Sequence, residues 1–145
     1  MARIKLITPE KSIAKLKYRV RITDINYGNH LGNDSLVSIL HNARMEWLTS
    51  MGYSELSIEG VSLTMNELVV NYLNESFFGD ELEIGISIGE ATRVSFEIYY
   101  IIEAKRKSEK TLIAKAKTGM VCFDYQKKKS VSVPDAFIQK INSNN

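Results

Sequence analysis

The sequence predicts an α+β fold in which one antiparallel sheet of about five strands wraps around a single long helix. Three observations predict it. Segments that alternate apolar and polar residues flank one segment with helical periodicity. Turn signals separate the later alternating segments, which favours antiparallel neighbours. The chain has 145 residues, enough for one core without metals or disulfides, so we expect residues 1–145 to form a single domain.

The first strand is predicted over Lys15–Thr23, where the alternation places Leu16, Tyr18, Val20 and Ile22 on one side and cations on the other. Asp24–Asp34 follows as an irregular loop, because two glycines and several Asn and Asp residues favour turns over regular backbone.

A helix is predicted from about Ser35 to Met51. Its apolar residues recur every three or four positions, namely Leu36, Leu40, Ala43, Trp47 and Met51. Asn33 or Asp34 can supply an N-cap oxygen, and Gly52 stands where a left-handed residue ends a helix.

Four further strands are predicted over Ser62–Leu73, Glu81–Ile88, Val94–Glu103 and Thr111–Asp124, with a charged turn at Lys105–Lys110. One helix cannot cover such a sheet entirely, so we expect a homodimer, or a dimer of such dimers. A stripe of residues suited to close packing on the last strand supports this expectation: Leu112, Ala114, Ala116, Met120 and Cys122.

Composition excludes several classes of function. The net charge of +2, with no basic helix face, argues against a nucleic-acid partner. The single Cys122 and two histidines exclude an internal disulfide and a cysteine zinc site, and no metal is expected. The N-terminus lacks an apolar signal, and no stretch approaches the roughly 20 apolar residues of a membrane span. We expect a cytoplasmic protein without a membrane partner.

The loop Asp24–Asp34 is the strongest candidate for chemistry. It concentrates polar side chains directly before a helix N-terminus, where free backbone N–H groups can stabilise an oxyanion or a carbonyl oxygen. The same residues can equally serve as turn formers that satisfy one another locally. Residue types and spacing leave both interpretations open.

Three motifs together resemble the hotdog-fold acyl-CoA thioesterases of the 4-hydroxybenzoyl-CoA thioesterase type and their acyl-ACP thioesterase relatives. The loop of those families typically reads D-x-D-x-x-G-H-V-N-N, and here it runs from Asp24 to Asn33. The helix carries A-R-x-E at Ala43–Glu46, and a strand feature runs from Val70 through Glu81. The resemblance covers roughly residues 14–137.

The resemblance implies hydrolysis of an acyl-CoA or acyl-ACP thioester to acid and thiol, in a site at a dimer interface and without a cofactor. The usual catalytic carboxylate of the family is the second Asp of D-x-D, and here Asn26 takes that place. An amide cannot act as a base at neutral pH. We therefore assign Asp24 and His30 as base and orienter, Asn26 as a residue that orients water, and Gly32 and Asn33 as oxyanion donors.

A phosphate of coenzyme A could bind to Arg93 or to Lys127 and Lys128. Lys127–Lys129 are equally explained as a solvated turn. We expect Arg44 to form a surface or interface ion pair without a catalytic role.

Two alternatives belong to other classes. A non-catalytic protein that binds acyl thioesters would explain Asn26. A hydratase or dehydratase of this fold, with the motif D-x-N-P-x-H, fits less well, because Tyr27 replaces the proline and His30 comes one residue late.

Overall fold

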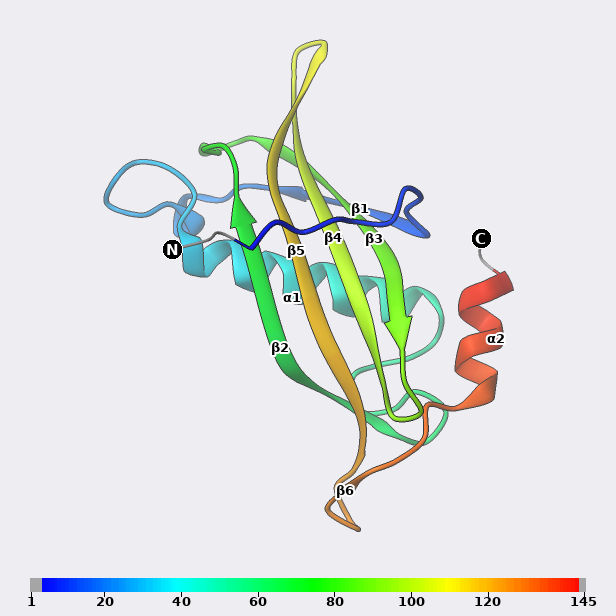
Figure 1. The fold of residues 1–145 in the computed structure, drawn as a ribbon. Coiled ribbons are helices and arrows are strands. Elements are labelled where there is room, and N and C mark those ends of the chain that lie inside the picture. Colours follow the sequence, from blue (N-terminus) through cyan, green and yellow to red (C-terminus); the bar gives the residue numbers. More distant parts are fainter. Residues whose placement is uncertain (1–3, 144–145) are drawn as a thin grey trace.

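The computed structural model describes residues 4–143, and Figure 1 shows one sheet with a long helix lying across one of its faces. A 3-10 helix, a two-residue strand and a second α-helix complete the structure. In chain order the elements are β1 (Ala14–Arg19), the 3-10 helix η1 (Ile22–Asp24), α1 (Asn33–Ser50), β2 (Ser62–Tyr72), β3 (Glu81–Ala91), β4 (Ser95–Arg106), β5 (Glu109–Asp124), β6 (Lys129–Ser130) and α2 (Asp135–Ser143).

The five long strands lie in the order β1-β3-β4-β5-β2, with every pair antiparallel, and β6 pairs with the end of β5. This confirms the predicted sheet and makes β1 and β2 its edges. The N-terminal segment crosses the face opposite α1 (Figure 1), where the Ser87 hydroxyl donates to the Lys11 carbonyl. Within residues 4–143, no helix is both long and apolar enough to cross a membrane.

Several strand boundaries differ from the prediction, and β3 runs past the expected Ile88 to Ala91. β1 ends at Arg19, before the expected Thr23, because the backbone turns into η1, where the Asp24 N–H donates to the Arg21 carbonyl. The β4–β5 hairpin continues through the pair Arg106 and Glu109, so the charged turn is shorter than expected. Antiparallel pairing holds the two charged strand ends together despite their polar sequence.

Helix α1 begins at Asn33, and its N-cap is Gly32, whose carbonyl accepts the Leu36 N–H. The expectation that Asn33 or Asp34 caps the helix is wrong, because both already lie in its first turn. The predicted end is confirmed, since Gly52 has a φ of +82° directly after the C-cap Met51. Glycine adopts this left-handed conformation without a Cβ clash.

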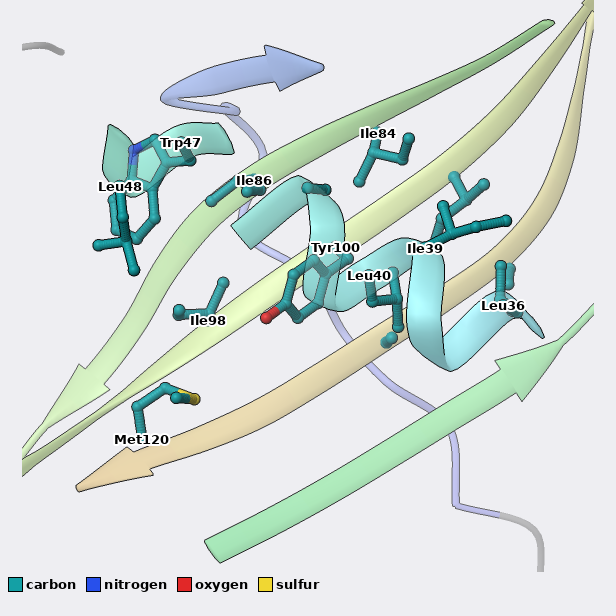
Figure 2. Close-up of a cluster of buried hydrophobic side chains, with 14 of the residues drawn as sticks. Leu36, Ile39, Leu40, Trp47, Leu48, Ile84, Ile86, Ile98, Tyr100 and Met120 are labelled. Carbon is teal, nitrogen blue, oxygen red and sulfur yellow. The ribbon is translucent and has the colours of Figure 1, made fainter. Parts of the chain in front are cut away.

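The core lies between α1 and the inner face of the sheet. Figure 2 shows Leu36, Leu40 and Trp47 on the helix together with Ile84, Ile98 and Met120 on the strands. All six side chains are buried. Burial of each large aliphatic side chain contributes about 1.5–3 kcal/mol. The packing between α1 and the sheet therefore fixes the position of α1, and with it the position of the helix start.

The close-packing stripe predicted on the last strand lies on β5. Its residues are mostly buried against this core within one subunit. The stripe therefore does not form a free dimer surface, and this part of the expectation is wrong. The exposed apolar side chains of the inner face instead lie on the edge strand β2, at Met65, Leu68 and Tyr72.

Helix α2 is not predicted from the sequence. Its Phe137 is buried and packs against the rings of Trp47, Tyr53 and Phe96. Lys140 donates to the Met51 carbonyl at 2.6 Å, which satisfies an orphan acceptor at the C-terminus of α1. The second helix thus closes the end of the core that lies farthest from the loop before α1.

Arg44 is buried, so the expectation of a surface or interface ion pair is wrong. Its Nε donates to Glu55 Oε2 at 2.8 Å and its Nη1 to the Tyr100 hydroxyl at 3.1 Å. The Tyr100 hydroxyl also bonds the Thr118 hydroxyl at 2.7 Å. A buried charge is stabilised by hydrogen-bonded partners, and this network supplies them for Nε and Nη1 of Arg44.

Candidate active site

The loop between η1 and α1 is closed by its own backbone. Asn26 N–H donates to the His30 carbonyl at 2.9 Å, and Gly32 N–H donates to the Asp24 carbonyl at 3.0 Å. Asn29 takes a φ of +69°, a left-handed conformation that asparagine tolerates better than most residues. The families that this loop resembles carry glycine at this position, and the backbone geometry explains that choice.

Asp24 fastens the loop to the sheet. Its Oδ2 accepts the Tyr18 hydroxyl and the Arg21 N–H, each at 2.8 Å. Burial and then the hydrogen bond to Asp24 raise the pKa of Tyr18, which keeps the phenol protonated as a donor. The Asp24 carboxylate therefore joins β1 to the turn from which the loop departs.

Asn26 is directed into the loop. Its Oδ1 accepts the Gly28 N–H at 2.9 Å and the His30 N–H at 3.5 Å. A carboxylate oxygen at this position could accept the same two bonds, because only the acceptor capacity is used. A Cβ on Gly28 would stand 3.3 Å from His30 Nε2, so the absence of one lets the imidazole approach the loop backbone.

A cavity of about 200 Å³ lies beside the N-terminus of α1. One wall comes from the loop and the helix start, and the other comes from the end of β2 and the segment that follows it. The lining residues are His30, Leu31, Gly32, Asn33, Leu36, Tyr72, Leu73, Asn74, Glu75, Ser76 and Ile113. The structure thus brings His30, Gly32 and Asn33 together around one space, whereas Asp24 and Asn26 do not line it.

The start of α1 lines this cavity through Gly32 and Asn33. The Gly32 N–H is used by the Asp24 carbonyl, so of the two predicted oxyanion donors Asn33 is the one at the open first turn of α1. The first N–H groups of a helix have no partner within the helix, and the helix dipole favours negative charge beside them. Tyr72 donates its hydroxyl to the Asn33 carbonyl at 2.9 Å and joins the two walls.

The His30 ring lies between two acceptors. Its Nδ1 is 3.4 Å from the Leu31 carbonyl oxygen, and its Nε2 is 3.9 Å from Glu75 Oε1. The His30 side chain is 33% exposed, so water can reach it. Sequence reasoning missed Glu75, which lies 45 positions from His30; its one available signal was its place inside the strand feature of the resemblance, which runs from Val70 through Glu81.

The predicted phosphate ligands lie at the other end of the sheet. Lys127 and Lys128 are exposed in the turn between β5 and β6, and Asp124 Oδ1 accepts the N–H groups of Gln126 and Lys127 there. Arg93 lies at the same end, since its guanidinium donates to the Ser132 hydroxyl at 3.1 Å. Within one subunit, the structure does not bring these cations to His30.

The described residues that line the cavity include no cysteine. Within the described range 4–143, no three His, Cys, Asp or Glu side chains group as a metal site. Burial raises the pKa of the Cys122 thiol to about 11, so it is protonated at neutral pH and is a poor nucleophile. The lining of the cavity contains an imidazole, a carboxylate and the first residues of a helix. Together they can polarise a carbonyl group and accept a proton from water.

Comparison with known proteins gives a family and a fold. A family model of the thioesterase-like superfamily matches residues 20–141. No curated protein sequence matches the chain.

Among solved structures, the chain is similar to a 1,4-dihydroxy-2-naphthoyl-CoA thioesterase from Synechocystis, with a TM-score of 0.78, 21% identity, and coverage of 88% of this chain and 94% of that one. For the 4-hydroxybenzoyl-CoA thioesterase from Pseudomonas sp. strain CBS-3, the TM-score is 0.76 at 16% identity, over 88% and 97% of the two chains. A mutant 4-hydroxybenzoyl-CoA thioesterase complexed with 4-hydroxybenzoyl-CoA gives 0.78 at 16% identity, with the same coverage. At these identities the likeness establishes the hotdog fold.

Proposed function

The chain belongs to the thioesterase-like superfamily, and we propose that it hydrolyses the thioester of an acyl-CoA or acyl-ACP to a free acid and a thiol. One observation carries this proposal: His30 and the first residues of α1 line the same cavity. A thioester whose carbonyl oxygen faces the Asn33 N–H would be polarised there by the helix dipole.

The reaction needs one proton acceptor. Water attacks the thioester carbonyl carbon, its proton passes to the base, and the negative charge develops on the oxygen beside the helix start. The C–S bond then breaks, and the proton returns to the departing thiolate, so that acid and thiol leave as products. A base must lie within hydrogen-bond reach of the attacking water, directly or through a second water.

The geometry favours His30 over Asp24 as that base. His30 lines the cavity, whereas Asp24 Oδ2 accepts one hydrogen bond from Tyr18 of β1 and one from the Arg21 N–H at the start of η1. Asp24 then acts as the anchor that holds His30 in place. Asn26 holds the same loop from inside through the N–H groups of Gly28 and His30.

The proposed site is completed by a second subunit. The outer edge of β2 pairs with no other strand of the described chain, and the apolar surface of its exposed Met65, Leu68 and Tyr72 reaches the cavity at Tyr72. An unpaired apolar edge invites pairing with another strand. Two copies related by a twofold axis would join their β2 strands antiparallel and cover this surface.

Such a dimer would also explain how Lys127 and Lys128, which lie far from the cavity of their own subunit, could contact a phosphate of bound coenzyme A. Ser62 pairs with Phe123 near the lysine turn, whereas Tyr72 lies at the cavity, so ten strand steps of about 3.3 Å, or about 33 Å, separate the two ends. The roughly thirteen bonds from the sulfur of coenzyme A to its first phosphorus span only about 15 Å when extended. Antiparallel β2 pairing brings Lys127 and Lys128 of one subunit to the cavity end of the other.

One observation favours a second candidate, a protein that binds acyl thioesters without cleaving them. Asn26 stands where the related enzymes usually carry their catalytic carboxylate. A chain that kept the cavity and lost the base would still bind the thioester.

The experiment that separates these candidates is an assay of thiol release from a panel of aliphatic and aromatic acyl-CoA substrates, 4-hydroxybenzoyl-CoA included. Turnover that depends on protein concentration supports the hydrolase. Saturable binding of the same compounds without thiol release supports the binding protein.

A further inference from the structure

Glu75 is a carboxylate on the wall of the cavity, and the loop motif does not contain it. Its Oε1 lies 3.9 Å from His30 Nε2, on the opposite wall. A gap of this size between two polar atoms is suited to a shared water molecule. In the tautomer whose Nδ1–H faces the Leu31 carbonyl, Nε2 has a lone pair, and both Nε2 and Glu75 Oε1 can accept hydrogen bonds from that water.

The backbone that carries Glu75 is fixed by several bonds. Arg106 donates to the Glu75 carbonyl at 2.9 Å and to Asp80 Oδ2 at 2.7 Å. The next residue, Ser76, is buried, and its carbonyl accepts the Leu31 N–H at 2.7 Å. These bonds fix the backbone of Glu75 beside the His30 wall, and from there its exposed side chain reaches toward the imidazole.

We propose that Glu75 is a catalytic residue that supplies the carboxylate missing at Asn26. This step rests on the proposed function. One water is held between Glu75 Oε1 and His30 Nε2, donating a proton to each. When its oxygen attacks the thioester carbon, the proton on the imidazole side moves to His30, and the negative charge of Glu75 stabilises the imidazolium that forms. The proton later leaves His30 with the thiol, and Glu75 stays ionised throughout.

The test measures kcat and KM for thiol release from the best acyl-CoA substrate. Glu75→Gln should lower kcat by at least about tenfold with little change in KM, because the water loses an acceptor and the imidazolium its counter-charge. Glu75→Asp should recover part of kcat. Glu109→Gln, an exposed carboxylate at the start of β5, serves as the matched control and should behave as the parent.

A double variant makes the test specific. If Glu75 replaces the carboxylate missing at Asn26, then Asn26→Asp introduced into Glu75→Gln should restore at least part of the lost kcat. A parent that hydrolyses acyl-CoA while Glu75→Gln keeps its kcat overturns this assignment and leaves the hydrolase standing. A lowered kcat that neither Glu75→Asp nor Asn26→Asp recovers shows a structural role for Glu75 and overturns it as well. A parent without activity on any acyl-CoA removes the proposed function, and the catalytic role of Glu75 with it.

Discussion

Tyr18 and Asp24 are joined by a 2.8 Å hydrogen bond, in which the phenol donates to the carboxylate oxygen Oδ2. The same oxygen accepts the Arg21 N–H. This bond links the end of β1 to the loop that carries His30, so the position of the imidazole depends on a residue of the sheet edge.

We predict that Asp24→Ala lowers the free energy of unfolding by about 1–3 kcal/mol, because two donors lose their acceptor. Asp24→Asn keeps an acceptor oxygen and should cost less than about 1 kcal/mol. Urea denaturation measures both. Tyr18→Phe, which removes only one of the two donors, is the control and should fall between them. An alanine variant as stable as the parent would show that Asp24 anchors nothing.

Asn26→Asp restores the usual carboxylate of the family in a loop that already holds an acceptor there. We expect this variant to fold as the parent does and to release thiol from acyl-CoA at the same rate or faster, since it adds a possible base. The rate is measured under saturating substrate. A tenfold loss of rate with unchanged stability would contradict this prediction.

We predict that the protein loses stability in acid, because the Glu55 carboxyl becomes protonated there. Its burial opposes ionisation, but hydrogen bonds and charges from Arg44 and His41 outweigh it, so the pKa of folded Glu55 lies below its ordinary 4.5. Because the folded pKa is lowered, the contribution of Glu55 is fully present above pH 4.5 and is lost as the pH falls through the folded value.

We therefore expect Glu55→Gln to be less stable than the parent at pH 7 by about 1–3 kcal/mol, the cost of leaving Arg44 without its charged acceptor. The difference should shrink as the pH falls below 4.5. Denaturation at several pH values measures it. A difference that stays constant down to pH 3 would exclude the ion pair as its cause.

Mixed dimers test whether the lysines act across subunits. His30→Gln lacks the proposed base, and the double variant Lys127→Gln, Lys128→Gln lacks the phosphate ligands, so each homodimer should be slow at low acyl-CoA concentration. Mixing the two should restore activity, because one site then combines an intact His30 with intact lysines of the partner.

Leu68→Lys introduced into both variants is the control, because a charge on the apolar side of β2 should separate the subunits and abolish this restoration. Sedimentation should show a dimer for the parent and a monomer for Leu68→Lys. A parent that sediments as a monomer at micromolar concentration, or a mixture without restored activity, would exclude lysines acting from a partner.

Much of the fold was predictable because its signals are local. The uninterrupted alternation of Leu82, Ile84 and Ile86 defines an inner strand face, and the periodicity from Leu36 to Met51 defines the helix. Helix α2 was not predicted because it has only nine residues, and its buried Phe137 packs against aromatic rings from distant parts of the chain.

The site was predictable only as far as it is contiguous in sequence. The loop motif identified His30 and Asn33, which do line the cavity. It could not show that the Gly32 N–H is used by Asp24, nor that Glu75 faces His30 across the space. The prediction of a surface or interface ion pair for Arg44 was wrong for the same reason, since its partners Glu55 and Tyr100 come from a distant loop and strand.

The account is tested most directly by kcat for thiol release from acyl-CoA, compared between His30→Gln and Asp24→Asn. We expect His30→Gln to lower kcat by about a hundredfold or more, within the range for loss of a general base, and Asp24→Asn to stay within about tenfold of the parent. The reverse result, a hundredfold loss in Asp24→Asn with His30→Gln near the parent rate, would contradict it and assign the base to Asp24.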